Sequence, residues 1–122
     1  MGDWWQWSPK KEEEALTFAV VGVGRFGTAV CRELISNGVD VLAADASEKA
    51  IDDLRQLEPS IEARVIDCTD EESMKESGIL EMNTVVVGIS EPIEASITTT
   101  LIAKDSEGTK VKRVIALSLI HI

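Results

Sequence analysis

The stretch Thr17-Phe-Ala-Val-Val-Gly-Val-Gly-Arg-Phe-Gly27 decides the fold predicted for this chain. Its first six residues show no polar alternation, as expected of a strand buried on both faces of a parallel sheet. The glycines match G-x-G-x-x-G, a pattern that places a diphosphate between a strand and a helix. Gly22 permits a tight turn, Gly24 lets backbone approach phosphate oxygens, and Gly27 lets the helix pack closely on the strand. A glycine-rich turn with a purely structural purpose is the alternative.

A carboxylate stands at the position expected of a ribose ligand. Asp45 ends the second predicted strand, 23 residues after Gly22, where it can accept hydrogen bonds from both ribose hydroxyls. Because Asp45 would repel a 2′-phosphate, the sequence favours NAD or an adenine nucleotide over NADP. The phosphates would lie at the helix N-terminus, on free N–H groups and the positive end of the helix dipole. A loop-capping aspartate is the alternative.

Two further candidate ligand residues, Arg25 and Phe26, lie inside the glycine motif. The Arg25 guanidinium can reach phosphate oxygens with two parallel hydrogen bonds. A solvated surface arginine fits the spacing equally well.

The segments that follow the third and fourth predicted strands complete the candidate site. Asp67-Cys68-Thr69 and Gly88-Ile89-Ser90 stand at carboxyl ends of strands, where a doubly wound sheet binds its ligands. The first segment is predicted to line the pocket for the base. The sequence is equally consistent with Asp67 or Thr69 acting only as turn or cap residues, and with Cys68 acting only as a small packing residue. The second is expected to contact ligand through its backbone, with Ser90 or Glu91 capping the next helix.

The remaining sequence predicts an α/β fold, a Rossmann-like doubly wound parallel sheet that is truncated after its fifth strand. Apolar runs alternate with amphipathic stretches, and turn residues separate them. Such a sheet would leave its last strand as an exposed edge. The expected strands are 17–22, 39–44, 63–66, 84–88 and 111–117, and the expected helices are 26–37, 47–57, 70–77 and 92–105.

Composition excludes several classes of function. The net charge of −10 argues against nucleic acid, since phosphate backbones are bound by clustered Lys and Arg. No apolar run approaches the roughly 20 residues needed to cross a bilayer. Two cysteines predict no disulfide framework and favour a reducing cytoplasm, and the single histidine, His121, argues against a zinc site. With no tyrosine and no internal histidine for acid–base chemistry, the site is predicted to bind without catalysing.

The motifs quoted above resemble the N-lobe of the regulator-of-potassium-conductance family, which includes the TrkA-N domains of Ktr- and Trk-type potassium uptake systems. The resemblance extends through Val85-Val-Val-Gly-Ile-Ser-Glu91 and the helix Ile93-Glu-Ala-Ser-Ile-Thr-Thr-Thr-Leu101. It implies a cytoplasmic, non-enzymatic regulatory subunit at the inner face of the membrane. Homodimers would assemble into a ring beneath a membrane-embedded potassium-translocating subunit, and ATP, ADP or NAD(H) in the crevice would gate it. Arg25 would contact the distal phosphate, where ATP and ADP differ.

The two ends of the chain depart from the family pattern. The sequence is therefore expected to divide into three segments. Residues 1–16 are expected to be a flexible, Trp-rich and acidic tail, and 17–117 the nucleotide-binding lobe. Residues 118–122 are expected to be an off-pattern ending. The rings of Trp4, Trp5 and Trp7 suit contact with a membrane interface or translocator, or opportunistic packing of a disordered leader.

Two other functional classes stay open from the sequence. One is the cofactor-binding half of a truncated NAD-dependent oxidoreductase, whose catalytic residues would lie outside this chain. The other is the sensing domain of a glutathione-gated potassium efflux protein, which would normally be fused to membrane helices.

Overall fold

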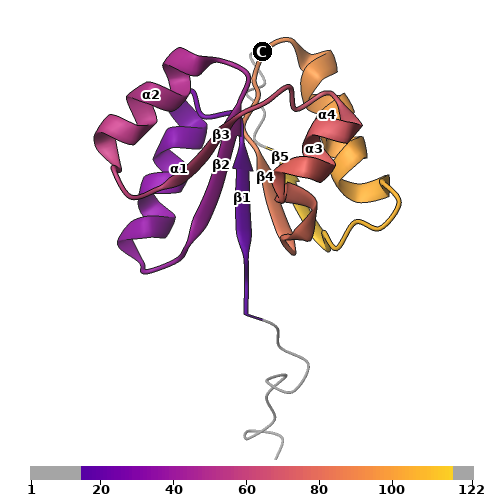
Figure 1. The fold of residues 1–122 in the computed structure, drawn as a ribbon, viewed down its shortest axis with the longest axis horizontal. Coiled ribbons are helices and arrows are strands. Elements are labelled where there is room, and N and C mark those ends of the chain that lie inside the picture. The colour runs from indigo at the N-terminus through magenta and orange to yellow at the C-terminus, as the bar shows by residue number, and fades with distance from the viewer. Residues whose placement is uncertain (1–14, 117–122) are drawn as a thin grey trace, which may run out of the picture.

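The computed structural model describes residues 15–116, which form a parallel five-stranded sheet with helices on both faces (Figure 1). The strands lie in the order β3-β2-β1-β4-β5, and each neighbouring pair is parallel. The predicted Rossmann-like, doubly wound fold is therefore confirmed. Strand bounds are β1 (Phe18–Val21), β2 (Val41–Asp45), β3 (Glu62–Val65), β4 (Thr84–Val87) and β5 (Arg113–Ala116).

Four α-helices connect these strands within the described residues, as the sequence predicted. A 3-10 turn, η3 (Ile79–Glu81), was not predicted; it follows Gly78, whose φ of +93° ends the preceding helix and redirects the chain. The helices are α1 (Arg25–Ser36), α2 (Glu48–Leu57), α3 (Glu71–Ser77) and α4 (Ile93–Asp105).

The helices divide between the two faces of the sheet and create two cores (Figure 1). Val20 of β1 packs with Cys31 and Ile51 beneath α1 and α2. Its neighbours in the strand, Ala19 and Val21, face the other way, toward the core beneath α3, η3 and α4. This alternation follows from the two-residue period of a strand, and it explains why β1 carries an apolar residue at every position.

The helix N-termini differ in how their free N–H groups are satisfied. Ser47 accepts a hydrogen bond from Ala50 N–H at the start of α2, and Asp70 accepts one from Ser73 N–H at the start of α3. Helices α1 and α4 begin after Gly24 and Pro92 without a side-chain cap. The expectation that Ser90 or Glu91 caps α4 is wrong, because the extended Pro92 occupies the N-cap position.

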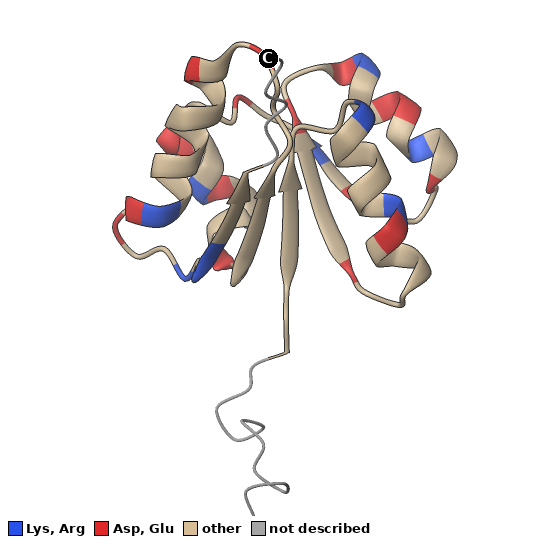
Figure 2. Cartoon of the chain, turned by 180° about the vertical axis from the view of Figure 1, so that it is seen from behind, with Lys and Arg blue, Asp and Glu red and all other residues tan. Residues whose placement is uncertain are grey.

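Charged side chains lie mainly on the helices and loops, while β1 and β4 carry none (Figure 2). Helices within residues 15–116 lack the combined length and hydrophobicity that crossing a bilayer requires. Residues 1–14 and 117–122 lie outside the described residues. The predictions for the Trp-rich tail and for the ending with His121 fall on those segments.

Candidate functional site

A crevice opens at the carboxyl ends of the strands, where the connections from β1 and β4 diverge to opposite faces of the sheet. Doubly wound sheets bind ligands at such a switch point. The crevice has a volume of about 310 Å³. Of the predicted ligand residues, Gly22, Asp45, Asp67, Cys68, Thr69 and Ile89 line it.

Sequence reasoning missed four residues that also line the crevice, namely Ala46, Glu91, Pro92 and Ala95. Ala46 directly follows Asp45, and the others form the β4–α4 loop and the first turn of α4. All four follow the carboxyl ends of β2 and β4, so the signal that could have identified them is their position in the loop after each strand and in the first turn of the next helix.

Three glycines meet at the junction of β1, α1 and β4. Gly22 has a φ of +91°, and a Cβ added there would lie 2.8 Å from Ile89 Cγ1. A Cβ on Gly27 would overlap the carbonyl oxygen of Gly22, and one on Gly88 would lie 2.7 Å from that same oxygen. Glycine is therefore required at all three positions by packing of the protein on itself. The sequence predicted that Gly88 contacts a ligand through its backbone. Packing against Gly22 is a second reason for glycine at this position.

Gly24 differs from these three glycines because its surroundings are open. No atom lies within 4 Å of a Cβ built on Gly24, which is exposed at the N-cap of α1. The hydroxyl of Thr28 donates a 2.8 Å hydrogen bond to the Val23 carbonyl and holds the loop against the helix. Because α1 has no capping side chain and no acidic residue in its first turn, its N-terminus is open to an anion.

Asp45 connects the glycine loop to the end of β2. One carboxylate oxygen accepts a 2.8 Å hydrogen bond from Val23 N–H, and the other accepts one of 2.8 Å from Ser47 N–H. Asp45 thus has the loop-capping role that the sequence left as an alternative, and it also lines the crevice. A carboxylate has about four lone-pair sites, so capacity for a ligand hydroxyl is left.

Asp67 and Thr69 form a tight polar turn at the edge of the crevice. One oxygen of Asp67 accepts hydrogen bonds from the Thr69 N–H at 2.9 Å and from its hydroxyl at 2.6 Å. These bonds favour the charged carboxylate and lower the pKa of Asp67 below its usual value. Both side chains are exposed and line the crevice. Their role in the turn therefore does not prevent them from contacting a ligand.

Cys68 is buried between this turn and the core beneath α4. Its carbonyl accepts a 3.0 Å hydrogen bond from the hydroxyl of Thr99. Burial, followed by the nearby carboxylates of Asp45 and Asp67, raises the pKa of the Cys68 thiol to about 12. The thiol is therefore neutral at physiological pH and is not a nucleophile.

Other predicted ligand residues lie beside the crevice and do not line it. Arg25 and Phe26 begin α1, both are exposed, and Arg25 has no ion-pair partner within residues 15–116. Ser90 is exposed in the β4–α4 loop. Gly24 and Arg25 thus stand at the start of α1, outside the set of residues that line the crevice.

The chemistry of the crevice suits binding. Its titratable side chains are the carboxylates of Asp45, Asp67 and Glu91 and the neutral thiol of Cys68. None of the residues that line it is a histidine, a lysine or a tyrosine. The crevice can thus accept hydrogen bonds from hydroxyl groups, while the lining offers no side chain suited to donate a proton near neutral pH.

Comparison with known proteins supports a family assignment. The family model of the TrkA-N domain matches residues 18–118. Ktr system potassium uptake protein C of Bacillus subtilis (strain 168) is 41% identical over 88 residues, which cover 72% of this chain and 39% of that protein. Ktr system potassium uptake protein A of Vibrio alginolyticus is 40% identical over 89 residues, covering 73% of this chain and 40% of that protein. The chain thus spans about two fifths of the length of these relatives.

Solved structures share the fold at lower identity. The TrkA-N domain of inner membrane protein ybaL from Escherichia coli superposes with a TM-score of 0.69 at 21% identity, covering 88% of this chain and 76% of that chain. A UDP-glucose 4-epimerase from Thermotoga maritima gives a TM-score of 0.68 at 21% identity, covering 83% and 37%. These likenesses show the Rossmann-like fold alone. The match of the family model over residues 18–118 shows that the chain belongs to the TrkA-N domain family.

Proposed function

We propose that this chain is the nucleotide-sensing lobe of a regulatory subunit that gates a Ktr- or Trk-type potassium uptake system. The proposal rests on the two Ktr system relatives, which are potassium uptake proteins by name and 40–41% identical to this chain. The ligand is ATP, ADP or NAD(H), and the role is regulatory and not enzymatic.

The observation that carries the ligand assignment is the pairing of the open N-terminus of α1 with the carboxylate of Asp45. Helix N–H groups suit phosphates, and a carboxylate at the end of β2 suits ribose hydroxyls. The volume of about 310 Å³ is at the low end of the range of about 300–1,000 Å³ for ligand pockets. Such a crevice suits the nucleoside, with the phosphates extending past Gly24 and Arg25 along the glycine loop.

Gating requires that a nucleotide bind one conformation of the assembly more tightly than another. A coupling of about 1–3 kcal/mol is typical of such regulation. The guanidinium of Arg25 is exposed and forms no ion pair within residues 15–116, which supports a contact with the γ-phosphate that ATP has and ADP lacks. We assign Arg25 this discrimination.

Regulation of a membrane-embedded potassium-translocating subunit would be exerted by homodimers assembled into a ring at the inner face of the membrane. An apolar stripe on α4 supports self-association: Ile93, Ile97 and Leu101 follow one another at four-residue spacing. Their side chains are 62%, 53% and 55% exposed. Exposed apolar residues gathered on one helix face are typical of a protein interface.

The cofactor-binding half of an NAD-dependent oxidoreductase is the main competing function. Reductases and epimerases share the fold at identities of 14–22%, which carries no information on activity. The absence of a proton-donating side chain among the residues that line the crevice disfavours catalysis by this chain.

Calorimetric titration of the purified chain with ATP, ADP, NADH and NADPH tests the proposal. We expect ATP, ADP or NADH to bind, and we expect NADPH to bind more weakly because Asp45 repels its 2′-phosphate. Binding of NADPH alone, or binding of none of the four, would contradict the proposed regulatory function.

A further inference from the structure

Helix α4 has one face that connects the crevice to the core of the molecule. Ala95, in its first turn, lines the crevice, and Thr99 and Ala103 follow it at four-residue spacing without exposed surface. Residues four apart lie on the same side of a helix, one turn after another. The wall of the crevice at Ala95 therefore continues into a buried face that includes Thr99.

The hydroxyl of Thr99 forms its hydrogen bond outside its own helix. A threonine within a helix can donate to the carbonyl four residues earlier, as Thr100 does to Ser96 at 2.8 Å. Thr99 instead donates a 3.0 Å hydrogen bond to the carbonyl of Cys68, 31 residues away in the sequence. Because a buried hydroxyl without a partner is costly, this bond favours one position of the loop after β3 relative to α4.

The loop Asp67-Cys68-Thr69 is otherwise hydrogen-bonded only locally within residues 15–116. Its other hydrogen bonds join Asp67 to Thr69, or join the loop to its chain neighbours Ile66 and Asp70. Apolar contacts of the buried Cys68 also hold the loop, but a hydrogen bond is directional and they are not. Among the described residues, Thr99 thus supplies the hydrogen bond that orients this loop against a second element.

We infer that Thr99 is a positioning residue for the base of the nucleotide. Through the Cys68 carbonyl it sets where Asp67 and Thr69 stand at the edge of the crevice, which both side chains line. Groups that contact a ligand keep their geometry only when supporting hydrogen bonds and packing hold them in place. The inference rests on the proposed function, because it takes a nucleotide as the ligand of the crevice.

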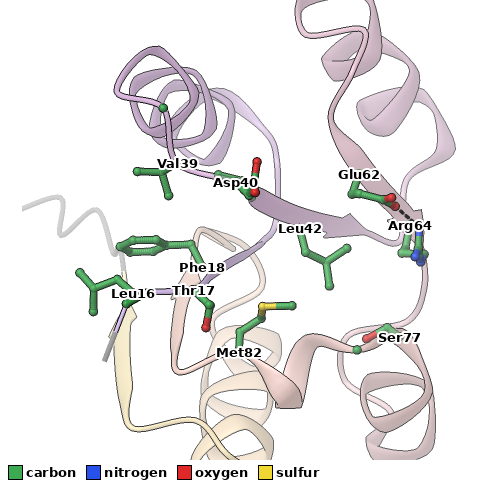
Figure 3. A pocket seen from close by; sticks show the side chains of 14 residues that line it. Leu16, Thr17, Phe18, Val39, Asp40, Leu42, Glu62, Arg64, Ser77 and Met82 are labelled. Atoms are coloured by element: carbon green, nitrogen blue, oxygen red, sulfur yellow. Dashed lines mark hydrogen bonds and ion pairs between the residues drawn. The ribbon is translucent and has the colours of Figure 1, made fainter. Parts of the chain in front are cut away.

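Thr84 is a counterpart of Thr99 at the opposite end of the sheet. It begins β4, it is 2% exposed, and its hydroxyl donates a 3.0 Å hydrogen bond to the side-chain oxygen of Asn83. A second hollow, of about 680 Å³, lies at these amino ends of the strands, and apolar side chains such as Phe18 and Met82 line it (Figure 3). None of the candidate nucleotide ligands line that hollow. Thr84 thus matches Thr99 in burial and bond length but does not face the crevice.

Calorimetric titration with ATP and ADP tests the inference on the unaltered chain and four variants. Thr99→Val keeps the shape of the side chain and removes the donor, so both nucleotides should bind about three- to tenfold more weakly. Thr99→Ser keeps a hydroxyl and should bind them within about twofold of the unaltered chain. Thr84→Val and Thr100→Val are the matched controls: each loses one hydroxyl hydrogen bond, and both should keep their nucleotide affinity.

Amide hydrogen exchange without nucleotide provides a second measurement. The N–H groups of Ile66, Thr69 and Asp70 all donate hydrogen bonds in or beside the loop. In Thr99→Val these amides should exchange several-fold faster while those of β1 keep their rate, because the variant loosens the loop and not the sheet. In Thr99→Ser the loop should exchange as it does in the unaltered chain.

The role of Thr99 is overturned if the loop of Thr99→Val exchanges at the rate of the unaltered chain, whether or not a nucleotide binds. It is also overturned by a loss of affinity that Thr99→Ser does not restore, or that Thr84→Val reproduces, since either indicates a general effect of packing or stability. Failure of the unaltered chain to bind ATP, ADP or NADH is a different result. It contradicts the proposed function and, with it, the assignment of a base to this loop.

Discussion

The carboxylate of Asp45 accepts a 2.8 Å hydrogen bond from the backbone N–H of Val23 and so joins the end of β2 to the glycine loop. The residue proposed to hold the ribose therefore also positions the loop proposed to hold the phosphates. If the proposed site binds a nucleotide, its ribose and phosphate contacts would be coupled through this one side chain.

Asp45→Ala should weaken ATP, ADP and NADH by similar factors, because the ribose contact is common to all three. Removing the acceptor of two backbone N–H groups should also lower the free energy of unfolding by about 1–3 kcal/mol. Calorimetric titration and urea denaturation measure the two effects. Asp53→Ala, on the exposed surface of α2, is the control and should change neither. Selective loss of one nucleotide would contradict the ribose role.

Gly24→Ala and Gly27→Ala should separate ligand binding from packing. A Cβ at position 24 meets open space, so the variant should keep its stability within about 1 kcal/mol and lose nucleotide affinity. A Cβ at position 27 overlaps the Gly22 carbonyl, so that variant should lose on the order of 3–5 kcal/mol or fail to fold. Equilibrium unfolding and nucleotide titration distinguish them. Full nucleotide affinity in Gly24→Ala would argue that phosphates do not pass there.

Arg25→Ala should narrow the difference in affinity between ATP and ADP, because the side chain is assigned to the distal phosphate. Stability should change by less than about 0.5 kcal/mol, since Arg25 is exposed and pairs with no described residue. Arg32→Ala, on the same helix and paired with Glu58, is the control for loss of a positive charge. If the ATP–ADP difference survives in Arg25→Ala, another group senses the distal phosphate.

Stability should decline at alkaline pH through the two buried thiols. Burial raises the pKa of the Cys31 and Cys68 thiols from 9.0 to about 12 in the folded chain. The folded state then binds more protons than the unfolded state between these values. Its stabilisation is complete below pH 9 and is lost as the pH rises toward 12. Urea unfolding between neutral and alkaline pH measures this decline, and a Cys31→Ala, Cys68→Ala double variant should show a shallower one. If stability falls equally steeply with pH in the double variant and in the unmodified chain, the buried thiols are not the cause of the decline.

The elements were predictable because local sequence specifies them. Apolar runs without alternation predicted β1 and β4, and Ser47 predicted the start of α2. The predicted strand starts at 39 and 111 were each two residues early. A strand ends where the adjacent strand no longer provides hydrogen-bond partners for its backbone, and the local sequence does not specify that position.

The site was predictable only in part. Parallel strands place the loops after their carboxyl ends at one edge of the sheet, so the sequence predicts which loops lie together. It does not predict which side chains within those loops contact one another. Sequence placed Asp67 and Thr69 at the crevice but could not say that they bond each other. Cys68 was predicted as a ligand residue only because of its position after the third strand. In the structure its side chain is buried, which indicates a packing role.

By itself the sequence determined the alternation of strands and helices, the glycine corner and the acid at position 45, because periodicity, glycine φ freedom and chain spacing are local properties. Only the tertiary structure decided that Gly88 packs against Gly22 and that Asn83 accepts a hydrogen bond from the N–H of Thr17. Only the structure, too, created the apolar hollow at the amino ends of the strands. These features join segments as many as 66 residues apart, and such contacts exist only once β4 lies beside β1.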